Sequence, residues 1–155
     1  MRKTQLFIAL FGLILLAACT LTPNGLLPTP TATQLVCHPS QTRLSKDGFS
    51  EIQGKMKSKG EIWALLFFDK AYAKQDEKIV WRIAGTGKQF DIHAQHQDGT
   101  IIHPIWGPEY HASSNWNRPG DEWGTGFNFP KPGCWTLPVT LGDTIGEIYL
   151  DVLAP

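Results

Sequence analysis

Short apolar runs separated by glycine- and proline-containing turns constrain the fold of this chain more than any other feature. Apolar and polar residues alternate along residues 78–84 and 134–141, the period-two pattern of a strand with one buried face. Residues 62–68 are apolar on both faces, which indicates a central strand covered on two sides. Together with the runs at 90–106, 127–129 and 148–152, these make about seven short strands and no convincing helix, a pattern that predicts an all-β, antiparallel sandwich.

Asp98-Gly99 marks a hairpin between two of these runs, because the pair suits the positive φ angles of a tight two-residue turn. That turn pairs the residues that flank it and sets which side chains share a face. The face expected to point into the core holds Phe90, Ile92, Ala94, His96, Ile101, His103 and Ile105. Residues 107–126 are expected to form a long loop, and Pro138 predicts a free edge or a bulge because proline lacks the ladder donor.

The charge balance excludes some classes of function. The 155 residues carry 14 Lys+Arg and 14 Asp+Glu, a formal net charge of +0, which argues against nucleic-acid binding. Charged residues make up 18% of the chain and hydrophobic residues 42%, so the bulk of it has enough apolar surface to form one core.

The N-terminus predicts export. Arg2 and Lys3 precede an uncharged apolar run at residues 6–16, and Leu16-Ala17-Ala18-Cys19 forms a lipobox. The resemblance to bacterial lipoproteins implies cleavage of a signal peptide, residues 1–18, and lipidation of Cys19. The alternative, an uncleaved transmembrane helix, is disfavoured because the run is shorter than the roughly 20 residues that a span needs. The expected location is extracytoplasmic and membrane-anchored, in the cell envelope.

Residues 19–36 form a Pro- and Thr-rich, uncharged segment that predicts an extended, lipidated tether. The folded domain is expected at residues 37–155. Its two cysteines, Cys37 and Cys134, are an even pair on the oxidising side of a membrane, so we predict a disulfide between them, with two free thiols as the alternative.

Two stretches carry a family resemblance. The segment Pro132-Gly133-Cys134-Trp135-Thr136-Leu137-Pro138-Val139, followed by Gly142-Asp143, resembles the penultimate-strand motif of bacterial Ig-like domains, with Trp135 where tyrosine is commoner. The stretch from Ile79 (IVWRIAGTG) through the segment that begins at Ile105 (IWGPEYHASSNWNRPGDEWGTGFNFPKPGCW) resembles an uncharacterised family of bacterial lipoproteins with a single Ig-like β-sandwich domain. The resemblance implies the fold and the surface location, and it implies no activity and no catalytic residues.

The stretch 106–127 is the candidate binding region, because flat aromatic rings beside amides and charged groups are what sugar-binding surfaces use. The candidate ligand-binding residues are Trp106, Tyr110, Trp116, Arg118 and Trp123. The alternative is that the tryptophans fold inward and cap one end of the sandwich, with Asn115, Asn117, Arg118 and Asp121 holding loop backbone.

Metal and catalytic sites receive less support from the sequence. His96 and His103, with His111 or Glu109, match no zinc-ligand spacing, so no metal and no cofactor are expected. Nucleophile, zinc-protease and phosphate-loop motifs are absent from the sequence, and a small hydrolase would have to use Glu109, Asp121 or Glu122.

The sequence therefore predicts an exported, lipid-anchored protein with a non-catalytic binding or structural role at the cell surface. A carbohydrate- or peptide-binding module and a small hydrolase are the alternatives. The expected partners are the membrane, through the lipid, and a cell-envelope protein or polysaccharide, with no nucleic acid.

Overall fold

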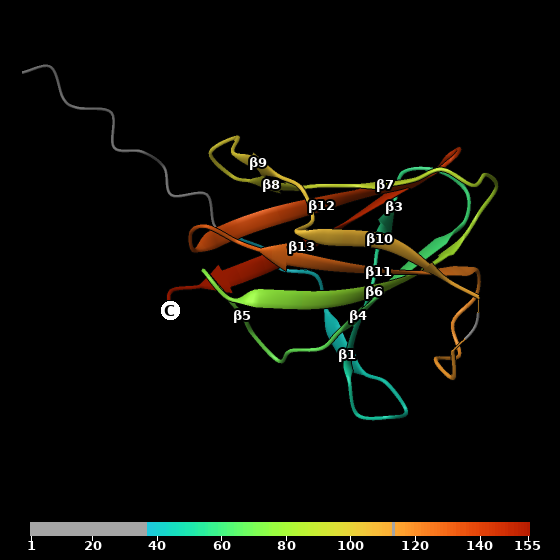
Figure 1. Cartoon of the computed structure of the whole chain (residues 1–155), viewed down its shortest axis with the longest axis horizontal. Coiled ribbons are helices and arrows are strands. Elements are labelled where there is room, and N and C mark those ends of the chain that lie inside the picture. Colours follow the sequence, from blue (N-terminus) through green and yellow to red (C-terminus); the bar gives the residue numbers. More distant parts are fainter. Residues whose placement is uncertain (1–36, 113) are drawn as a thin grey trace, which may run out of the picture. The chain divides into compact units, whose positions relative to one another are not determined.

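The computed structural model describes residues 37–112 and 114–155, and within these ranges the chain is an all-β sandwich of two packed sheets (Figure 1). The first sheet has the strand order β1 (Thr42–Leu44), β2 (Ser50–Gln53), β4 (Glu61–Leu66), β6 (Asp76–Ala84), β11 (Asp121–Asn128), β10 (Trp106–His111). The second has the order β3 (Lys55–Met56), β13 (Thr144–Leu153), β12 (Gly133–Leu141), β8 (Ala94–His96), β9 (Ile101–Ile102). β7 (Phe90–Ile92) also pairs with β12, and β5 (Ala71–Tyr72) adds a short parallel pairing to β13. The predicted β-sandwich is confirmed.

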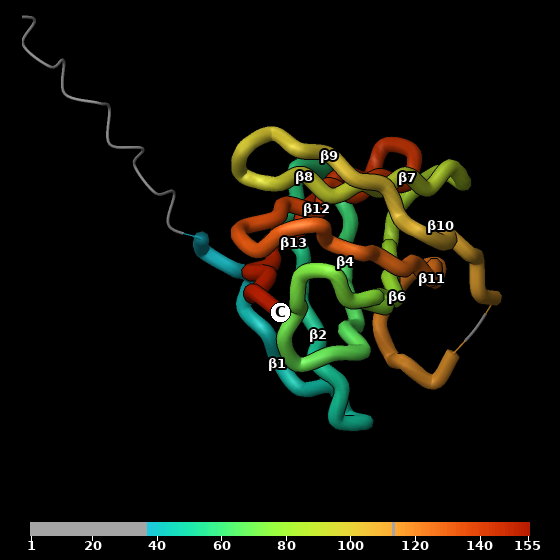
Figure 2. The backbone as a smooth tube through the Cα atoms, turned by 60° about the vertical axis from the view of Figure 1, so that its left-hand side comes forward, coloured from blue at the N-terminus to red at the C-terminus, as the bar shows by residue number. Residues whose placement is uncertain are grey.

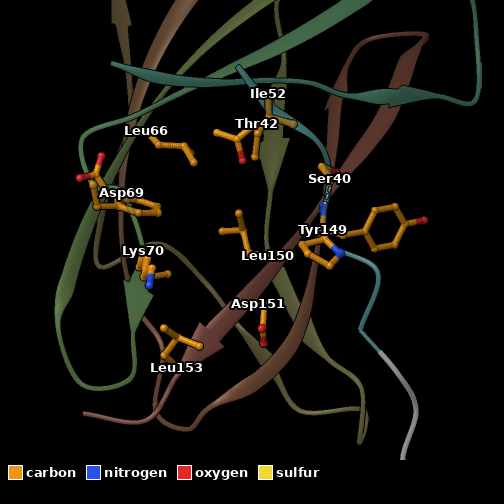
Figure 3. Close-up of a pocket in the computed structure, with 13 residues that line it drawn as sticks. Ser40, Thr42, Ile52, Leu66, Asp69, Lys70, Tyr149, Leu150, Asp151 and Leu153 are labelled. Carbon is orange, nitrogen blue, oxygen red and sulfur yellow. Dashed lines mark hydrogen bonds between the residues drawn. The ribbon is translucent and has the colours of Figure 1, made fainter. Parts of the chain in front are cut away.

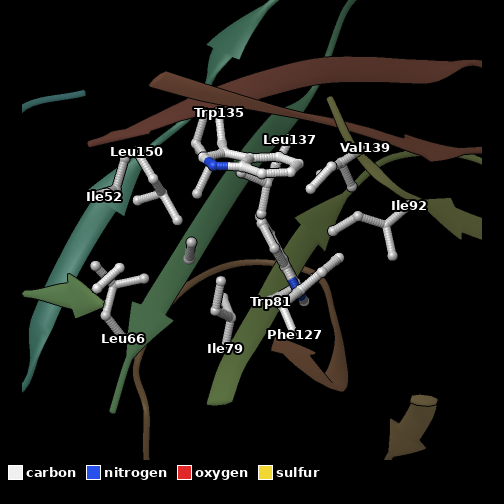
Figure 4. Close-up of a cluster of buried hydrophobic side chains, with 14 of the residues drawn as sticks. Ile52, Leu66, Ile79, Trp81, Ile92, Phe127, Trp135, Leu137, Val139 and Leu150 are labelled. Atoms are coloured by element: carbon white, nitrogen blue, oxygen red, sulfur yellow. The ribbon is translucent and has the colours of Figure 1, made fainter. Parts of the chain in front are cut away.

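The core lies between the two sheets, where alternate side chains of facing strands meet (Figure 4). Trp81, Phe127 and Trp135 are fully buried there, as the alternation along their strands predicts. The indole N–H of Trp81 donates to Thr125 Oγ1 at 2.9 Å, so this large side chain enters the core without leaving its donor unpaired.

β12 contains the Gly133–Trp135 motif that resembles a tyrosine corner, and it also contains Pro138. Gly133 has a φ of +125°, and the indole N–H of Trp135 donates to the carbonyl of Lys131 at 3.2 Å. The tryptophan thus makes a bond back to upstream backbone of the kind that a corner tyrosine makes through its hydroxyl. Pro138 lies in a central strand with neither a free edge nor a bulge, opposite the interruption between β7 and β8, where a ladder donor is not required.

The hairpin register differs by one residue from the predicted one. Ile101 pairs with Gln95, so the turn contains three residues, 97–99, and only Gly99 has a positive φ, +90°. A three-residue loop that ends in a left-handed residue is the next commonest hairpin connection, and a one-residue slip reverses the face of every following side chain. Consequently Ile101, His103 and Ile105 are exposed, whereas the first half of the predicted core face is buried as expected.

Residues 107–126 are not one long loop. They contain most of β10 and the first part of β11, which pair with each other, and β11 also pairs along its whole length with β6. Glycines and a proline obscure the strand pattern here: β10 has a bulge between Trp106 and Glu109, and Gly124 and Gly126 contribute no side chain to the alternation.

The predicted disulfide joins Cys37 to Cys134, with Cα atoms 5.2 Å apart. It connects residues 97 positions apart, and closing a loop of about 100 residues restricts the unfolded chain by about 4 to 5 kcal/mol in the chain-entropy model. The predicted signal peptide, Cys19 and the predicted tether lie outside the described residues. Among the residues that the structure describes, none form a helix long and apolar enough to cross a membrane.

Candidate functional site

Residues 114–120, which precede β11, fold back over the outer face of the first sheet; we call them the strap (Figure 2). Trp116 of the strap is buried against Trp63, Leu65 and Val80, which project from β4 and β6 on the side away from the core. This small second cluster explains why the 62–68 run is apolar on both faces: one face forms the core and the other holds the strap.

A buried carboxylate fixes the position of the strap. Glu51 of β2 is 2% exposed and accepts a hydrogen bond from the Trp116 indole N–H at 3.0 Å. Arg118 donates to both oxygens of the same carboxylate, from its Nε at 3.2 Å and from its Nη2, and its guanidinium lies 3.8 Å from the Trp63 ring centroid. Burial alone raises the pKa of Glu51, but the Arg118 and Trp116 hydrogen bonds outweigh it and hold the pKa below its ordinary value.

A second buried carboxylate supports the two ends of the strap. Glu122 of β11 has one oxygen 2.9 Å from Arg82 Nε and the other 3.3 Å from His111 Nδ1. Ser114 donates its hydroxyl to Glu122, and Arg82 donates to the Gly120 carbonyl at 2.9 Å. Charged groups at both ends of the strap are therefore paired, which makes it an ordered part of the surface.

The structure agrees with the capping interpretation only in the burial of Trp116, which covers the outer face of one sheet and not an end of the sandwich. The interpretation is wrong for the polar residues of the loop. Trp116 is 9% exposed, as a structural cap requires. Arg118 holds the Glu51 side chain rather than loop backbone. Asn115, Asn117 and Asp121 are exposed, and their side chains make no hydrogen bond within residues 37–112 and 114–155.

Trp106 lies on the same outer face, near the free edge of the sheet. A side chain at Gly126 would place its Cβ in collision with Trp106 Nε1, and one at Gly124 would contact Trp106 and His111 at 3.4 Å. The two glycines therefore create the space in which the indole lies flat on β11. Trp106 is packed against backbone and is only half-buried.

The remaining two candidates, Tyr110 and Trp123, face the opposite way, at one mouth of the sandwich. Trp123 stacks on Phe90 of the core with ring centroids 5.1 Å apart, and Tyr110 meets Trp123 edge-on at 5.2 Å. Tyr110 is 56% exposed, and the buried indole N–H of Trp123 has no acceptor in the described part of the chain. Lys88 and Asp121 complete a hollow of about 260 Å³ around this pair, which we call the aromatic hollow.

The five candidate binding residues are thus divided between two places. Trp106, Trp116 and Arg118 belong to the packed outer face, and Tyr110 and Trp123 line the aromatic hollow. Sequence reasoning missed Lys88, which reaches the hollow from the turn before β7, and Glu51, which organises the strap. Neither has a local signal, because each comes from chain far from residues 106–127.

Other hollows in the described part of the chain contain neither Tyr110 nor Trp123, and one of them, of about 320 Å³, lies over the strap at Trp116 and Arg118. Two more are of similar or smaller size than the aromatic hollow. One, of about 270 Å³, lies where residues 39–42 pass from the second sheet to the first, with Ile52, Leu66 and Leu150 of the core in its lining (Figure 3). Ser40 is bonded to the backbone of Tyr149 beside it. The other, of about 200 Å³, lies beside the strap, with Phe49 and Phe67 at its rim. Phe67 already has the Lys78 ammonium 4.3 Å above its ring.

The histidines and carboxylates weighed for chemistry do not converge. His96 is buried beside Trp135, with its Nε2 3.2 Å from the Pro132 carbonyl, whereas His103 is exposed and His111 contacts Glu122. Asp121 and Glu122 are adjacent in a strand and therefore face opposite sides of the sheet. No group of three or more His, Cys, Asp or Glu side chains suited to a metal ion occurs in the described ranges.

Comparison of the sequence with protein-family models and with curated proteins finds no match. A function for this chain therefore has to be inferred from the geometry of its own side chains.

Proposed function

We propose that this protein is an exported, lipid-anchored protein of the cell envelope, and that its β-sandwich has a non-catalytic binding role with the aromatic hollow as the ligand site. The lipobox that ends at Cys19 supports the anchor. The disulfide between Cys37 and Cys134 supports the location, because such bonds persist in oxidising compartments.

One observation carries the binding role: Tyr110 is more than half exposed, yet its ring is held in place. It contacts Trp123, which in turn is stacked on a buried core residue, Phe90. An exposed aromatic side chain that is already packed against its neighbour binds a ligand without a large loss of side-chain entropy. The strap residues lack this property, since their rings and charges are already occupied by one another.

A hydrolytic function receives less support from the same geometry. Glu122 is 3% exposed; one of its oxygens is paired with Arg82 and accepts from Ser114, and the other contacts His111, so both oxygens already have partners. Asp121 lies at the hollow, on the other face of the sheet, and Glu109 is exposed on β10. A glycosidase needs two carboxyl groups facing one bond, and these three side chains are distributed over both faces of the sheet.

The binding role is tested by co-sedimentation of the full chain, in detergent micelles, with insoluble cell walls from the bacterium that produces it. We expect the unaltered chain to sediment with the walls and Tyr110→Ala to remain largely in solution. Phe67→Ala is the matched control, because Phe67 is also an exposed aromatic residue but lies on the strap side. Equal sedimentation of all three proteins would contradict the proposal.

The anchor is tested separately with Cys19→Ser. We expect this variant to accumulate as unprocessed precursor or to leave the membrane fraction, measured by fractionation and by the mass of the N-terminal peptide. Normal processing and membrane retention of Cys19→Ser would show that the lipobox does not operate.

A further inference from the structure

The aromatic hollow has a chemistry that specifies one class of ligand. It combines an exposed, fixed Tyr110 ring and a Trp123 wall with two charged side chains, Lys88 and Asp121. From this combination we infer that the hollow binds an uncharged sugar ring of an envelope polysaccharide, an inference that rests on the binding role proposed above.

The shape of the hollow favours a single ring. At about 260 Å³ it is slightly below the roughly 300 Å³ at which pockets for drug-sized ligands begin. It is also open at the mouth of the sandwich, where Tyr110 is 56% exposed. A ring within a longer chain can therefore enter while its neighbours remain in solvent, which suits a polysaccharide better than a compact free metabolite.

The aromatic surface favours a ligand with one apolar face. One face of the Trp123 ring is covered by Phe90, whose ring is nearly parallel to it at an interplanar angle of 8°. The Tyr110 ring stands at 65° to the Trp123 ring. The two rings thus form a corner, with one surface to lie under a ligand and one beside it. The C–H groups on one face of a pyranose pack against such a surface, while its hydroxyl groups point outward.

The charges of the hollow favour a neutral ligand with both donors and acceptors. Lys88 carries donors only and Asp121 carries acceptors only, and their charges cancel. A hydroxyl group can accept from Lys88 and donate to Asp121, so adjacent hydroxyl groups satisfy both side chains. A uronic acid or a polyamine would satisfy one of them and be repelled by the other.

The strap side of the sheet provides an internal contrast that supports this assignment. There, the Trp63 ring is covered by the Arg118 guanidinium and the Trp116 N–H is bonded to Glu51. In the aromatic hollow, neither Lys88 nor Asp121 is part of an ion pair among residues 37–112 and 114–155. The exposed Tyr110 ring and these two charged side chains therefore meet at the aromatic hollow.

The experiment displaces the full chain in detergent micelles from insoluble cell walls with four soluble probes: cellohexaose, chitohexaose, maltohexaose and the acidic hexamer of galacturonic acid. We expect at least one neutral hexasaccharide to displace the protein and the acidic hexamer to be weaker by about tenfold. Direct titration with the effective probe should show binding weakened about tenfold by Tyr110→Ala, the equivalent of one aromatic contact. Asp121→Asn and Lys88→Met should each weaken it about fivefold, and Phe67→Ala should leave it unchanged.

Two results separate this inference from the proposed function. If Tyr110-dependent sedimentation with the walls persists but no neutral hexasaccharide displaces the protein, or if protease treatment of the walls abolishes it, the ligand is not a sugar and the binding role stands. If sedimentation with the walls does not depend on Tyr110, both fail. Displacement by the acidic hexamer alone would also overturn the inference, because it would identify an anionic ligand.

Discussion

The outer face under the strap and the aromatic hollow lie on opposite sides of one sheet and draw on the same stretch of chain. They differ in whether their polar side-chain atoms have hydrogen-bond partners within the protein. Under the strap, the Trp116 N–H, the Arg118 guanidinium and the Glu51 carboxylate satisfy one another. At the hollow, the Trp123 N–H has no acceptor among the described residues, and Tyr110 is mostly exposed. Side chains that satisfy each other build structure, whereas rigid side chains that remain available can bind a ligand.

The largest expected effect separates the two regions by stability. Trp116→Ala removes an indole packed on Trp63, Leu65 and Val80, so we expect the free energy of unfolding to fall by about 3 to 5 kcal/mol. Tyr110→Ala should cost no more than about 0.5 to 1.5 kcal/mol, the value of one aromatic pair. Chemical denaturation of the full chain in detergent measures both. Equal losses would show that the hollow is as structural as the strap.

A smaller effect tests the hydrogen bonds directly. Trp116→Phe and Trp123→Phe remove the same part of an indole, but only the first breaks a bond to a buried carboxylate. We expect Trp116→Phe to cost about 1.5 to 3 kcal/mol more than Trp123→Phe, the range for a hydrogen bond to a charged group. Denaturation midpoints that shift equally would mean that the two N–H groups are in equivalent environments.

Two glycines of β11 test whether Trp106 belongs to the packed side. Gly126→Ala forces Trp106 away from the strand, and we expect a cost of about 1 to 3 kcal/mol, as for other overpacked positions. Gly124→Ala makes contacts of ordinary length, 3.4 Å, and should change stability by less than about 0.5 kcal/mol. Thermal melting of the two variants side by side gives the answer, and a stable Gly126→Ala variant would show that the indole is free to move.

The effect confined to the acid range concerns Glu51. Its pKa is lowered in the folded state, so its contribution to stability is present above about pH 4.3, the ordinary value, and is lost as the pH falls through the folded value. Glu51→Gln should therefore reduce the loss of stability on acidification. Burial raises the pKa of Glu77, so the contribution of Glu77 to the free energy of unfolding is lost as the pH rises through its folded value. Glu77→Gln is therefore a control with the opposite pH dependence. Identical pH profiles for both variants would contradict the assignment.

The fold was accessible from sequence because its signals are local. A period-two pattern needs only neighbouring residues, and it located most strands, the buried Trp81 and Trp135, and the half of the hairpin before its turn. It failed where one residue decides the outcome: the choice of a three-residue turn over a two-residue turn moved Ile101 from the core face to solvent. It also failed at β10 and β11, where glycines carry no pattern.

The sequence by itself determined a small all-β domain with two cysteines that pair, because alternation and cysteine count are properties of the chain alone. Only the tertiary structure decided how residues 106–127 divide between two faces. That division depends on long-range contacts such as that of Arg118 with Glu51, 67 positions apart. It also places a turn residue from before β7, Lys88, at the same hollow as Tyr110 and Trp123. Which aromatic side chains are packed and which are available follows from strand pairing and from the path of the strap over the sheet, and no local pattern encodes either.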